Sequence, residues 1–131
     1  MSQENVERMR EGIDAMNRRD IDAVLVGMDP EVRFEHRLAD LQGTFVGIDG
    51  VRSWFADLVE TFDAWHIECD DIRDVGDRVL ALGTIHARGR ESGVETEFPL
   101  SVVAQYEDGV LTDFTDYGDH ELALEAVGLE E

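Results

Sequence analysis

The start of the chain carries a hydrophobic pattern with the period of an α-helix. Apolar side chains recur at three- and four-residue steps at Val6, Met9, Ile13 and Met16. This spacing places all of them on one face of a helix of about four turns. Asp20 is positioned to cap a second, short helix, which we expect to end at Asp29-Pro30 because the residue before a proline avoids helical geometry. Two amphipathic helices therefore open the chain.

An extended stretch and a third helix follow. Val32, Phe34 and His36 alternate with polar residues, which is typical of a strand that presents all three on one face. Residues 37–47 are expected to form a loop, after which Asp49 caps a helix. We expect the inner face of this helix to carry Val51, Phe55, Leu58 and Phe62, with Trp54 on the flank.

From Trp65 onwards the pattern changes to that of strands. Turn signals at Gly76-Asp77, Gly89–Gly93 and Asp108-Gly109 separate three long runs rich in β-branched and aromatic residues. Strands joined by such hairpins run in opposite directions. The sequence therefore predicts an antiparallel sheet.

Proline and glycine mark further features of the strand region. Pro99 lies inside the run 94–106, and because proline has no N–H for the ladder we expect a bulge or bend there. Gly118 breaks the last strand, Asp119 is suited to cap a final helix, and Gly128 ends it.

Both side-chain sets of the strands are partly apolar, as where Leu80 and Leu82 alternate with Val79 and Ala81. One face of the sheet is expected to meet the helices, and the other is too apolar to meet water alone. We therefore expect a homodimer interface on the outer face. The pattern as a whole predicts one α+β domain spanning 1–131, in which a curved antiparallel sheet wraps around the N-terminal helices and encloses an apolar pocket.

Charge limits the partners of the chain. The formal net charge is −20, and all eleven basic side chains are arginine. Such a surface repels phosphate backbones and anionic lipids, so we expect neither a nucleic acid nor a membrane partner. The residues Met1–Glu4 have no signal-peptide character and no apolar run is long enough to span a bilayer, so a cytoplasmic location is expected. Cys69 is the single cysteine, and we interpret it as a packing residue.

The order of several short segments resembles one protein family. These segments are Val6–Val24, Asp29–Val32, Gly47–Phe55, Gly76–Val79, Tyr106–Gly109 and Tyr117. They resemble the SnoaL-like group of the nuclear-transport-factor-2-like superfamily, which includes polyketide cyclases, ketosteroid isomerases, dehydratases, epoxide hydrolases and noncatalytic binding proteins. The resemblance implies a cone-shaped α+β fold that is usually dimeric, but it does not imply one function.

The catalytic residues of the known enzymes do not all carry over. Resemblance to ketosteroid isomerase would require a tyrosine on the first helix, a general-base aspartate after the first strand and a proton-donating aspartate on a later strand. These positions hold Gly12, His36 and Val102. SnoaL-type cyclases use an acidic residue on a late strand, and Val102 stands against that role as well. His36 is able to replace the base, but it does not replace the hydrogen-bond donors.

His36 and Asp116 are the candidate catalytic residues. His36 shares the face of Phe34, and its ordinary pKa of ~6.5 suits proton transfer near neutrality. Asp116 alternates with Thr112 and Phe114, so it is expected to face the same cavity as an acid or as the group that orients His36. The alternatives are a histidine hydrogen-bonded at the pocket rim and a strand-end aspartate that binds backbone groups near Gly118.

Apolar and aromatic residues are expected to form the ligand-binding wall, although each is also a core candidate. The set is Phe34, Trp54, Phe55, Leu58, Phe98, Leu100, Val102, Tyr106 and Phe114. The Tyr106 hydroxyl is a possible donor to a ligand oxygen. His86 is interpreted as exposed or as facing a dimer partner. No metal motif and no phosphate-binding glycine loop occur in the sequence, so no metal and no cofactor are expected.

Three functions remain open at this point. The first is a cofactor-independent isomerase, cyclase or dehydratase for a small apolar molecule, with His36 as base and Asp116 as its partner. The second is a noncatalytic dimer whose pocket holds an apolar ligand without turnover. The third is a protein-interaction module that uses the sheet face. The approach of His36 to Asp116 in an open cavity separates the first function from the other two.

Overall fold

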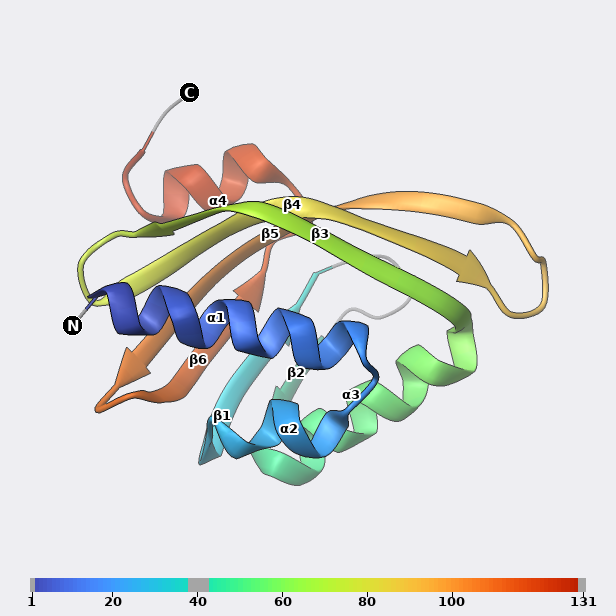
Figure 1. Ribbon diagram of the computed structural model, residues 1–131, viewed down its shortest axis with the longest axis horizontal. Helices are drawn as coiled ribbons and strands as arrows, with labels where there is room; N and C mark the ends of the chain where they lie inside the picture. The colour runs from blue at the N-terminus through green and yellow to red at the C-terminus, as the bar shows by residue number, and fades with distance from the viewer. Residues whose placement is uncertain (1, 38–42, 130–131) are drawn as a thin grey trace.

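The computed structural model describes residues 2–37 and 43–129 (Figure 1). The four helices are α1 (Ser2–Asn17), α2 (Ile21–Val26), α3 (Gly47–Thr61) and α4 (His120–Ala126). The six strands are β1 (Met28–His36), β2 (Gly43–Val46), β3 (Phe62–Asp74), β4 (Arg78–Gly89), β5 (Glu95–Glu107) and β6 (Val110–Asp116). Within the described residues, no helix is both long enough and apolar enough to cross a membrane.

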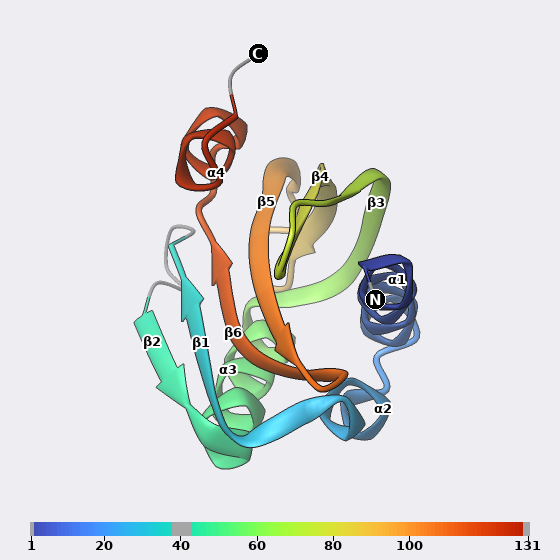
Figure 2. The ribbon, with the colours of Figure 1, turned by 90° about the vertical axis from the view of Figure 1, so that its left-hand side faces the viewer.

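All six strands belong to one sheet, in the order β2-β1-β6-β5-β4-β3. Neighbouring strands are antiparallel except β1 and β6, which run parallel. Figure 2 shows how strongly the sheet curls, so that β3 and β1 both approach the helices on its concave side. The predicted α+β class, with a curved and mostly antiparallel sheet around the N-terminal helices, is confirmed.

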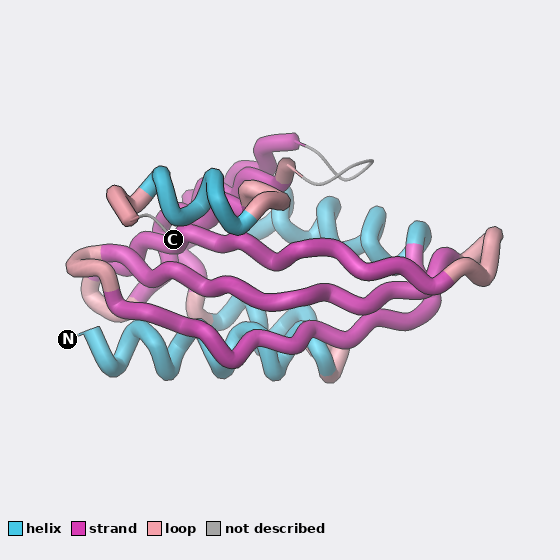
Figure 3. The backbone as a smooth tube through the Cα atoms, turned by 90° about the horizontal axis from the view of Figure 1, so that it is seen from above, coloured by secondary structure: helices cyan, strands magenta, loops and turns pink. Residues whose placement is uncertain are grey.

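The helices cover both faces of the sheet. Helices α1, α2 and α3 lie on the concave side, whereas α4 lies on the convex side (Figures 1 and 3). The inner core joins Met9 of α1 and buried residues of the other inner helices to inward residues of the strands. Among these strand residues, Val79, Ala81 and Val102 are fully or almost fully buried. Burial of this apolar surface is the main force that holds the helices in the cone.

The second apolar side-chain set of the strands packs against α4. Leu80, Leu82 and Val103 point to the convex face and form a second buried cluster with Ala123 and Leu124. One short helix of the same chain therefore covers the surface that the sequence assigned to a dimer interface. The alternation of Leu80 and Leu82 with Val79 and Ala81 does not require a second copy of the chain.

The helix caps predicted at Asp20 and Asp119 are confirmed. The Asp20 carboxylate accepts a hydrogen bond from the Ala23 N–H at 3.1 Å, and the Asp119 carboxylate accepts one from the Leu122 N–H at 3.0 Å. The prediction for Asp49 is wrong, because α3 begins at Gly47 and Asp49 lies inside its first turn. A carboxylate there still interacts favourably with the positive end of the helix dipole.

The ends of two other elements differ from the sequence expectation. Helix α2 ends at Val26 rather than at Asp29-Pro30, because the chain enters β1 at Met28 and the Gly27 carbonyl accepts a bond from the Leu111 N–H. The expected loop 37–47 contains strand β2, which pairs with β1. The part of that loop at 38–42 lies outside the described residues.

The predicted phase of α3 is rotated by one residue. Val51 and Trp54 are its buried positions, whereas Phe55 and Leu58 are half-buried. Phe62 is already the first residue of β3, so it no longer shares the helical period. The inner face of α3 is therefore centred on Trp54 rather than on Phe55.

Pro99 lies in regular strand geometry, contrary to expectation. It pairs with Thr84 in an unbroken β4–β5 register, whereas β6 pairs with β5 only from Val102 onwards. The second edge of β5 therefore needs no N–H from Pro99. Register shifts occur elsewhere, between Gln105 and Tyr106 in β5 and at two places in β3. One of those in β3 lies between Glu68 and Asp71, where a Cβ on the facing Gly83 would overlap the Glu68 carbonyl.

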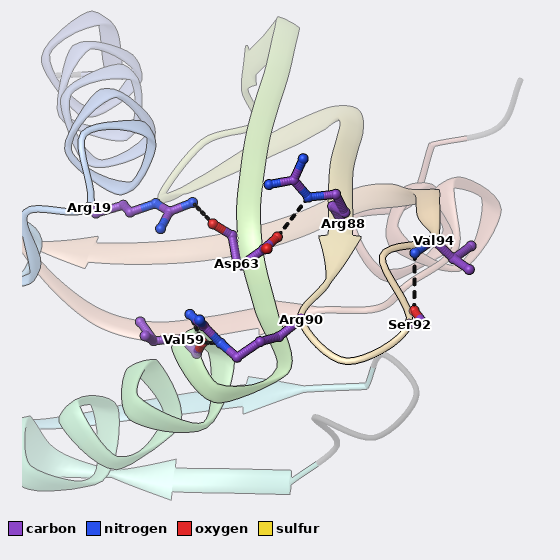
Figure 4. Close-up of polar contacts among 7 residues, drawn as sticks. All are labelled: Arg19, Val59, Asp63, Arg88, Arg90, Ser92 and Val94. Atoms are coloured by element: carbon purple, nitrogen blue, oxygen red, sulfur yellow. Dashed lines mark hydrogen bonds and ion pairs between the residues drawn. The ribbon is translucent and has the colours of Figure 1, made fainter.

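Arginines tie the end of α3 to the β4–β5 hairpin (Figure 4). Arg90 donates two hydrogen bonds to the Val59 carbonyl, at 2.8 and 3.1 Å. The Asp63 carboxylate accepts from Arg88 at 2.8 Å, while the Asp63 carbonyl accepts from Arg19 at 2.8 Å. Because the last turn of α3 has no basic residue of its own, the hairpin supplies the cation that binds its terminal carbonyls.

Candidate functional site

A cavity of about 430 Å³ lies between the three inner helices and the concave face of the sheet. This volume is in the usual range for small-molecule sites. Of the predicted wall, three residues come from the helical side and β1, namely Phe34, Trp54 and Leu58. Four come from β5 and β6, namely Leu100, Val102, Tyr106 and Phe114.

Two predicted ligand-binding residues do not line the cavity. Phe55 turns to the side of α3, where its ring meets Trp65 edge to face at a centroid distance of 6.0 Å. Phe98 packs against Phe62, also at 6.0 Å, near the distal end of the long hairpin. Both predictions are wrong. Phe55 is displaced because α3 is rotated from its predicted phase, and the Phe98 ring lies beyond the enclosed part of the cone.

The parallel pairing of β1 with β6 brings His36 opposite Asp116. Both side chains point into the cavity, and their exposed fractions are 5% and 1%. His36 Nε2 lies 3.5 Å from Asp116 Oδ2. Residues eighty positions apart in the sequence thus form an acid–base pair inside an apolar chamber.

The two carboxylate oxygens of Asp116 have different partners. Oδ1 accepts hydrogen bonds from the backbone N–H groups of Ser101 and Gly118, at 3.2 and 3.1 Å. Oδ2 faces His36. Both sequence interpretations of Asp116 are therefore observed. Oδ1 binds backbone groups near Gly118 at the end of the strand, and Oδ2 lies beside His36.

Burial moves the two pKa values towards each other. It lowers the pKa of His36 below 6.5, an effect that the neighbouring Asp116 partly offsets. It raises the pKa of Asp116 above 3.8, opposed by His36 and by the two backbone N–H donors. An acid and a base whose pKa values approach one another exchange a proton at a small cost in free energy.

Aromatic rings enclose the pair. The rings of Phe34 and Phe114 stack at 4.4 Å with an interplanar angle of 9°, and Phe34 also contacts Trp54 at 4.7 Å. The Trp54 ring lies 5.6 Å from the His36 ring. These contacts surround the imidazole with apolar surface, and a low local dielectric strengthens the electrostatic interactions of the pair.

Sequence reasoning missed one polar residue of the cavity wall, Arg8, and misjudged how deeply another, Trp54, is buried. Arg8 lines the cavity together with Gly12, which is four residues later on the same helix face, so helical spacing contained this signal. Trp54 was assigned to a flank, yet it is 94% buried (exposed fraction 6%), and its indole N–H has no hydrogen-bond partner among the described residues. Gly12 and Val102 line the cavity without supplying a polar group.

The remaining candidates lie outside the cavity. His86 is on the convex face, between the carboxylates of Glu68 and Glu97, so it is an exposed surface residue. Burial raises the pKa of the Cys69 thiol to about 11, which suits a packing role. Within 2–37 and 43–129, no group of three or more His, Cys, Asp and Glu side chains is placed to hold a metal ion.

Comparison with known proteins decides the family. The model of the SnoaL-like domain matches residues 7–114, most of the chain. The chain belongs to the SnoaL-like family. No protein with curated annotation matches the sequence.

Solved structures of similar proteins share this fold. A nuclear-transport-factor-2-like protein of unknown function from Burkholderia pseudomallei is 25% identical, with a TM-score of 0.82 over 95% of this chain and 98% of that one. TerC, co-crystallised with polyporic acid, is 23% identical, with a TM-score of 0.80 over 95% and 98%. A Catenulispora acidiphila protein with a ketosteroid isomerase-like fold, in complex with trimethylamine, is 14% identical, with a TM-score of 0.77 over 95% and 94%.

Proposed function

We propose that this SnoaL-like protein binds a small, largely apolar molecule and that His36 and Asp116 transfer a proton at its polar group. The observation that carries the proposal is the pair itself, 3.5 Å apart and buried in a cavity of about 430 Å³. The reaction class is a cofactor-independent isomerisation, cyclisation or dehydration, each of which starts with removal of a proton next to an electron-withdrawing group.

The geometry supports specific roles for the two residues. His36 is neutral near pH 7 because burial lowers its pKa, so it is ready to accept a proton. Asp116 then stabilises the imidazolium through Oδ2. Both residues line the cavity, so a ligand group is able to approach the pair.

A noncatalytic binding function is the second candidate. The two backbone hydrogen bonds to Asp116 Oδ1 account for the burial of this carboxyl without any reaction. Gly12 and Val102 also stand where related enzymes carry hydrogen-bonding groups. The structures of TerC with polyporic acid and of the C. acidiphila protein with trimethylamine support binding of a small molecule under either function.

Native mass spectrometry of the purified protein tests the binding step. We expect the wild type to retain or take up an apolar molecule, and we expect His36→Ala and Asp116→Asn to fold normally but to hold less of it. His86→Ala is the matched control, because His86 lies on the opposite face of the sheet. Equal retention by the wild type and by both cavity variants would contradict a role for the pair.

We also propose that the chain forms a homodimer, on the strength of its family. The apolar residues of the outer face do not support this, since α4 covers them. Light scattering at increasing salt tests the proposal, because screening weakens the repulsion between two subunits that each carry a formal charge of −20. A monomer at micromolar concentration in both low and high salt would contradict it.

A further inference from the structure

The polar groups of the cavity lie at two separate ends. His36 and Asp116 form one end, and Arg8 and Tyr106 line the other. Val102 is the β5 partner of Asp116, and Tyr106 lies four positions further along the same strand. At about 3.3 Å per strand residue, the two ends are roughly 13 Å apart. The wall between them is formed mainly by the apolar side chains described above.

Tyr106 presents a hydrogen-bond donor that the protein does not use. Its ring packs against the inner core, so its side chain belongs to the concave face. Its hydroxyl makes no hydrogen bond to any other described residue, although it lines the cavity. Burial raises the pKa of Tyr106 to about 12, so the hydroxyl stays protonated at any ordinary pH.

Arg8 lies beside Tyr106 at the open end of the cone. Its guanidinium covers the β5–β6 turn so closely that a Cβ on Gly109 would lie 2.8 Å from Nη2. Nη1 donates to the Asn5 side chain at 2.8 Å, while Glu4 is 3.7 Å away. In Figure 2 this end of α1 and the β5–β6 turn face the viewer and lie close together.

We propose that Arg8 and Tyr106 form a second binding site, which recognises an uncharged oxygen acceptor at the end of the ligand remote from His36 and Asp116. Arg8 and Tyr106 also line a polar hollow outside the cavity, where the carboxylates of Glu4, Asp77 and Asp108 are found. These carboxylates, with the net charge of −20, oppose entry of an anion. A carbonyl or ester oxygen meets two donors without this repulsion. The inference rests on the proposed function, since one ligand must reach both ends.

Three matched probes test this site. The first is a naphthol with an acetyl group on the opposite ring, the second replaces acetyl by ethyl, and the third replaces it by carboxylate. Quenching of tryptophan fluorescence reports binding, since Trp54 is in the wall. Wild type is compared with Tyr106→Phe and Arg8→Gln. Tyr117→Phe is the control, because Tyr117 packs with the outer cluster.

We expect wild type to bind the acetyl probe about fivefold or more tighter than the ethyl probe, as one neutral hydrogen bond allows, and the carboxylate probe more weakly than the acetyl probe. Tyr106→Phe should remove the preference for acetyl and Arg8→Gln should reduce it, whereas Tyr117→Phe should keep it. Equal binding of acetyl and ethyl probes by wild type, or a preference unchanged by Tyr106→Phe, would overturn the inference and leave the proposed function standing. Tightest binding of the carboxylate would overturn the choice of an uncharged group. Failure of wild type to bind any probe would count against the cavity as a binding site and so against both proposals.

Discussion

Asp116 joins the architecture of the sheet to the chemistry of the cavity through its contact with His36. Oδ2 faces the imidazole at 3.5 Å, while Oδ1 receives the N–H groups of Ser101 and Gly118. The same backbone contacts that end β6 therefore aim the carboxylate at the histidine. Substitutions of Asp116 that keep an oxygen at the Oδ1 position should therefore affect stability differently from those that remove it.

Asp116→Ala should destabilise the protein much more than Asp116→Asn. Alanine leaves two N–H groups without a partner, and each unsatisfied buried group costs about 1–3 kcal/mol. Asparagine keeps an oxygen at the Oδ1 position, so both bonds survive. Urea unfolding measures the two losses, and Asp113→Ala, on the outward face of the same strand, serves as a control. Equal losses for Ala and Asn would show that the backbone bonds contribute little.

The free energy of unfolding of Asp116→Asn, relative to that of wild type, should increase as pH rises from below 3.8 to neutral. Burial raises the folded-state pKa of Asp116, so folded wild type holds this proton more tightly than the unfolded chain does. The associated stability is present below the unfolded pKa and is lost as pH rises through the folded pKa. Asparagine does not titrate and escapes that loss. Unfolding curves at several pH values measure the difference, and an opposite slope would show that the carboxyl pKa is lowered instead.

Helix α4 supplies a direct test of how the convex face is covered. Leu124 is 4% exposed and packs on the outer cluster, whereas Leu122 on the same helix is 47% exposed. Leu124→Ala should lower the free energy of unfolding by about 2–5 kcal/mol. Leu122→Ala should change it by about 0.5 kcal/mol or less, as for most surface sites. Similar costs at both positions would mean that α4 does not hold the orientation described above.

Substitutions of two glycines by alanine should have opposite effects on stability. A Cβ at Gly83 would overlap the Glu68 carbonyl, so Gly83→Ala should cost at least about 1–3 kcal/mol as the backbone shifts. Nothing lies within 4 Å of a Cβ at Gly12, which is in the middle of α1, so Gly12→Ala should add about 0.5–1 kcal/mol. Thermal denaturation distinguishes the two signs. A stabilising Gly83→Ala would rule out the close approach of the two strands.

Much of this fold could be predicted from the sequence because the patterns that indicate its elements are local. Hairpin turns, the caps at Asp20 and Asp119, and the alternation at Val32, Phe34 and His36 each depend on a few neighbouring residues. That alternation placed His36 on an inward face, and the alternation with Phe114 did the same for Asp116. Their pairing depends on the parallel contact of β1 with β6, which no local pattern specifies.

The errors arose where tertiary structure decides between similar local patterns. Apolar residues lie on two adjacent faces of α3, so the sequence did not distinguish Trp54 from Phe55 as the centre of the buried face. Pro99 appeared unfavourable for a central strand because it has no N–H to donate. However, β6 is too short to reach Pro99, so no strand pairs with β5 on that side of the proline. The outward apolar residues of β4, Leu80 and Leu82, were assigned to a partner subunit. The helix that covers them, α4, lies roughly forty residues later in the sequence, so no local pattern revealed the contact.

Removal of a carbon-bound proton inside the cavity tests the proposed chemistry most directly. Nitrobenzisoxazole is a compact apolar probe: a base removes its ring C–H proton, the N–O bond breaks, and a coloured cyanophenolate forms. Wild type should accelerate this reaction above the buffer rate, with activity that falls as His36 becomes protonated. His36→Ala should lose about 100-fold or more of the acceleration, as expected for a general base, while His86→Ala on the convex face should retain it. Equal rates for wild type and His36→Ala, with both proteins folded, would contradict the assignment of His36 as the base.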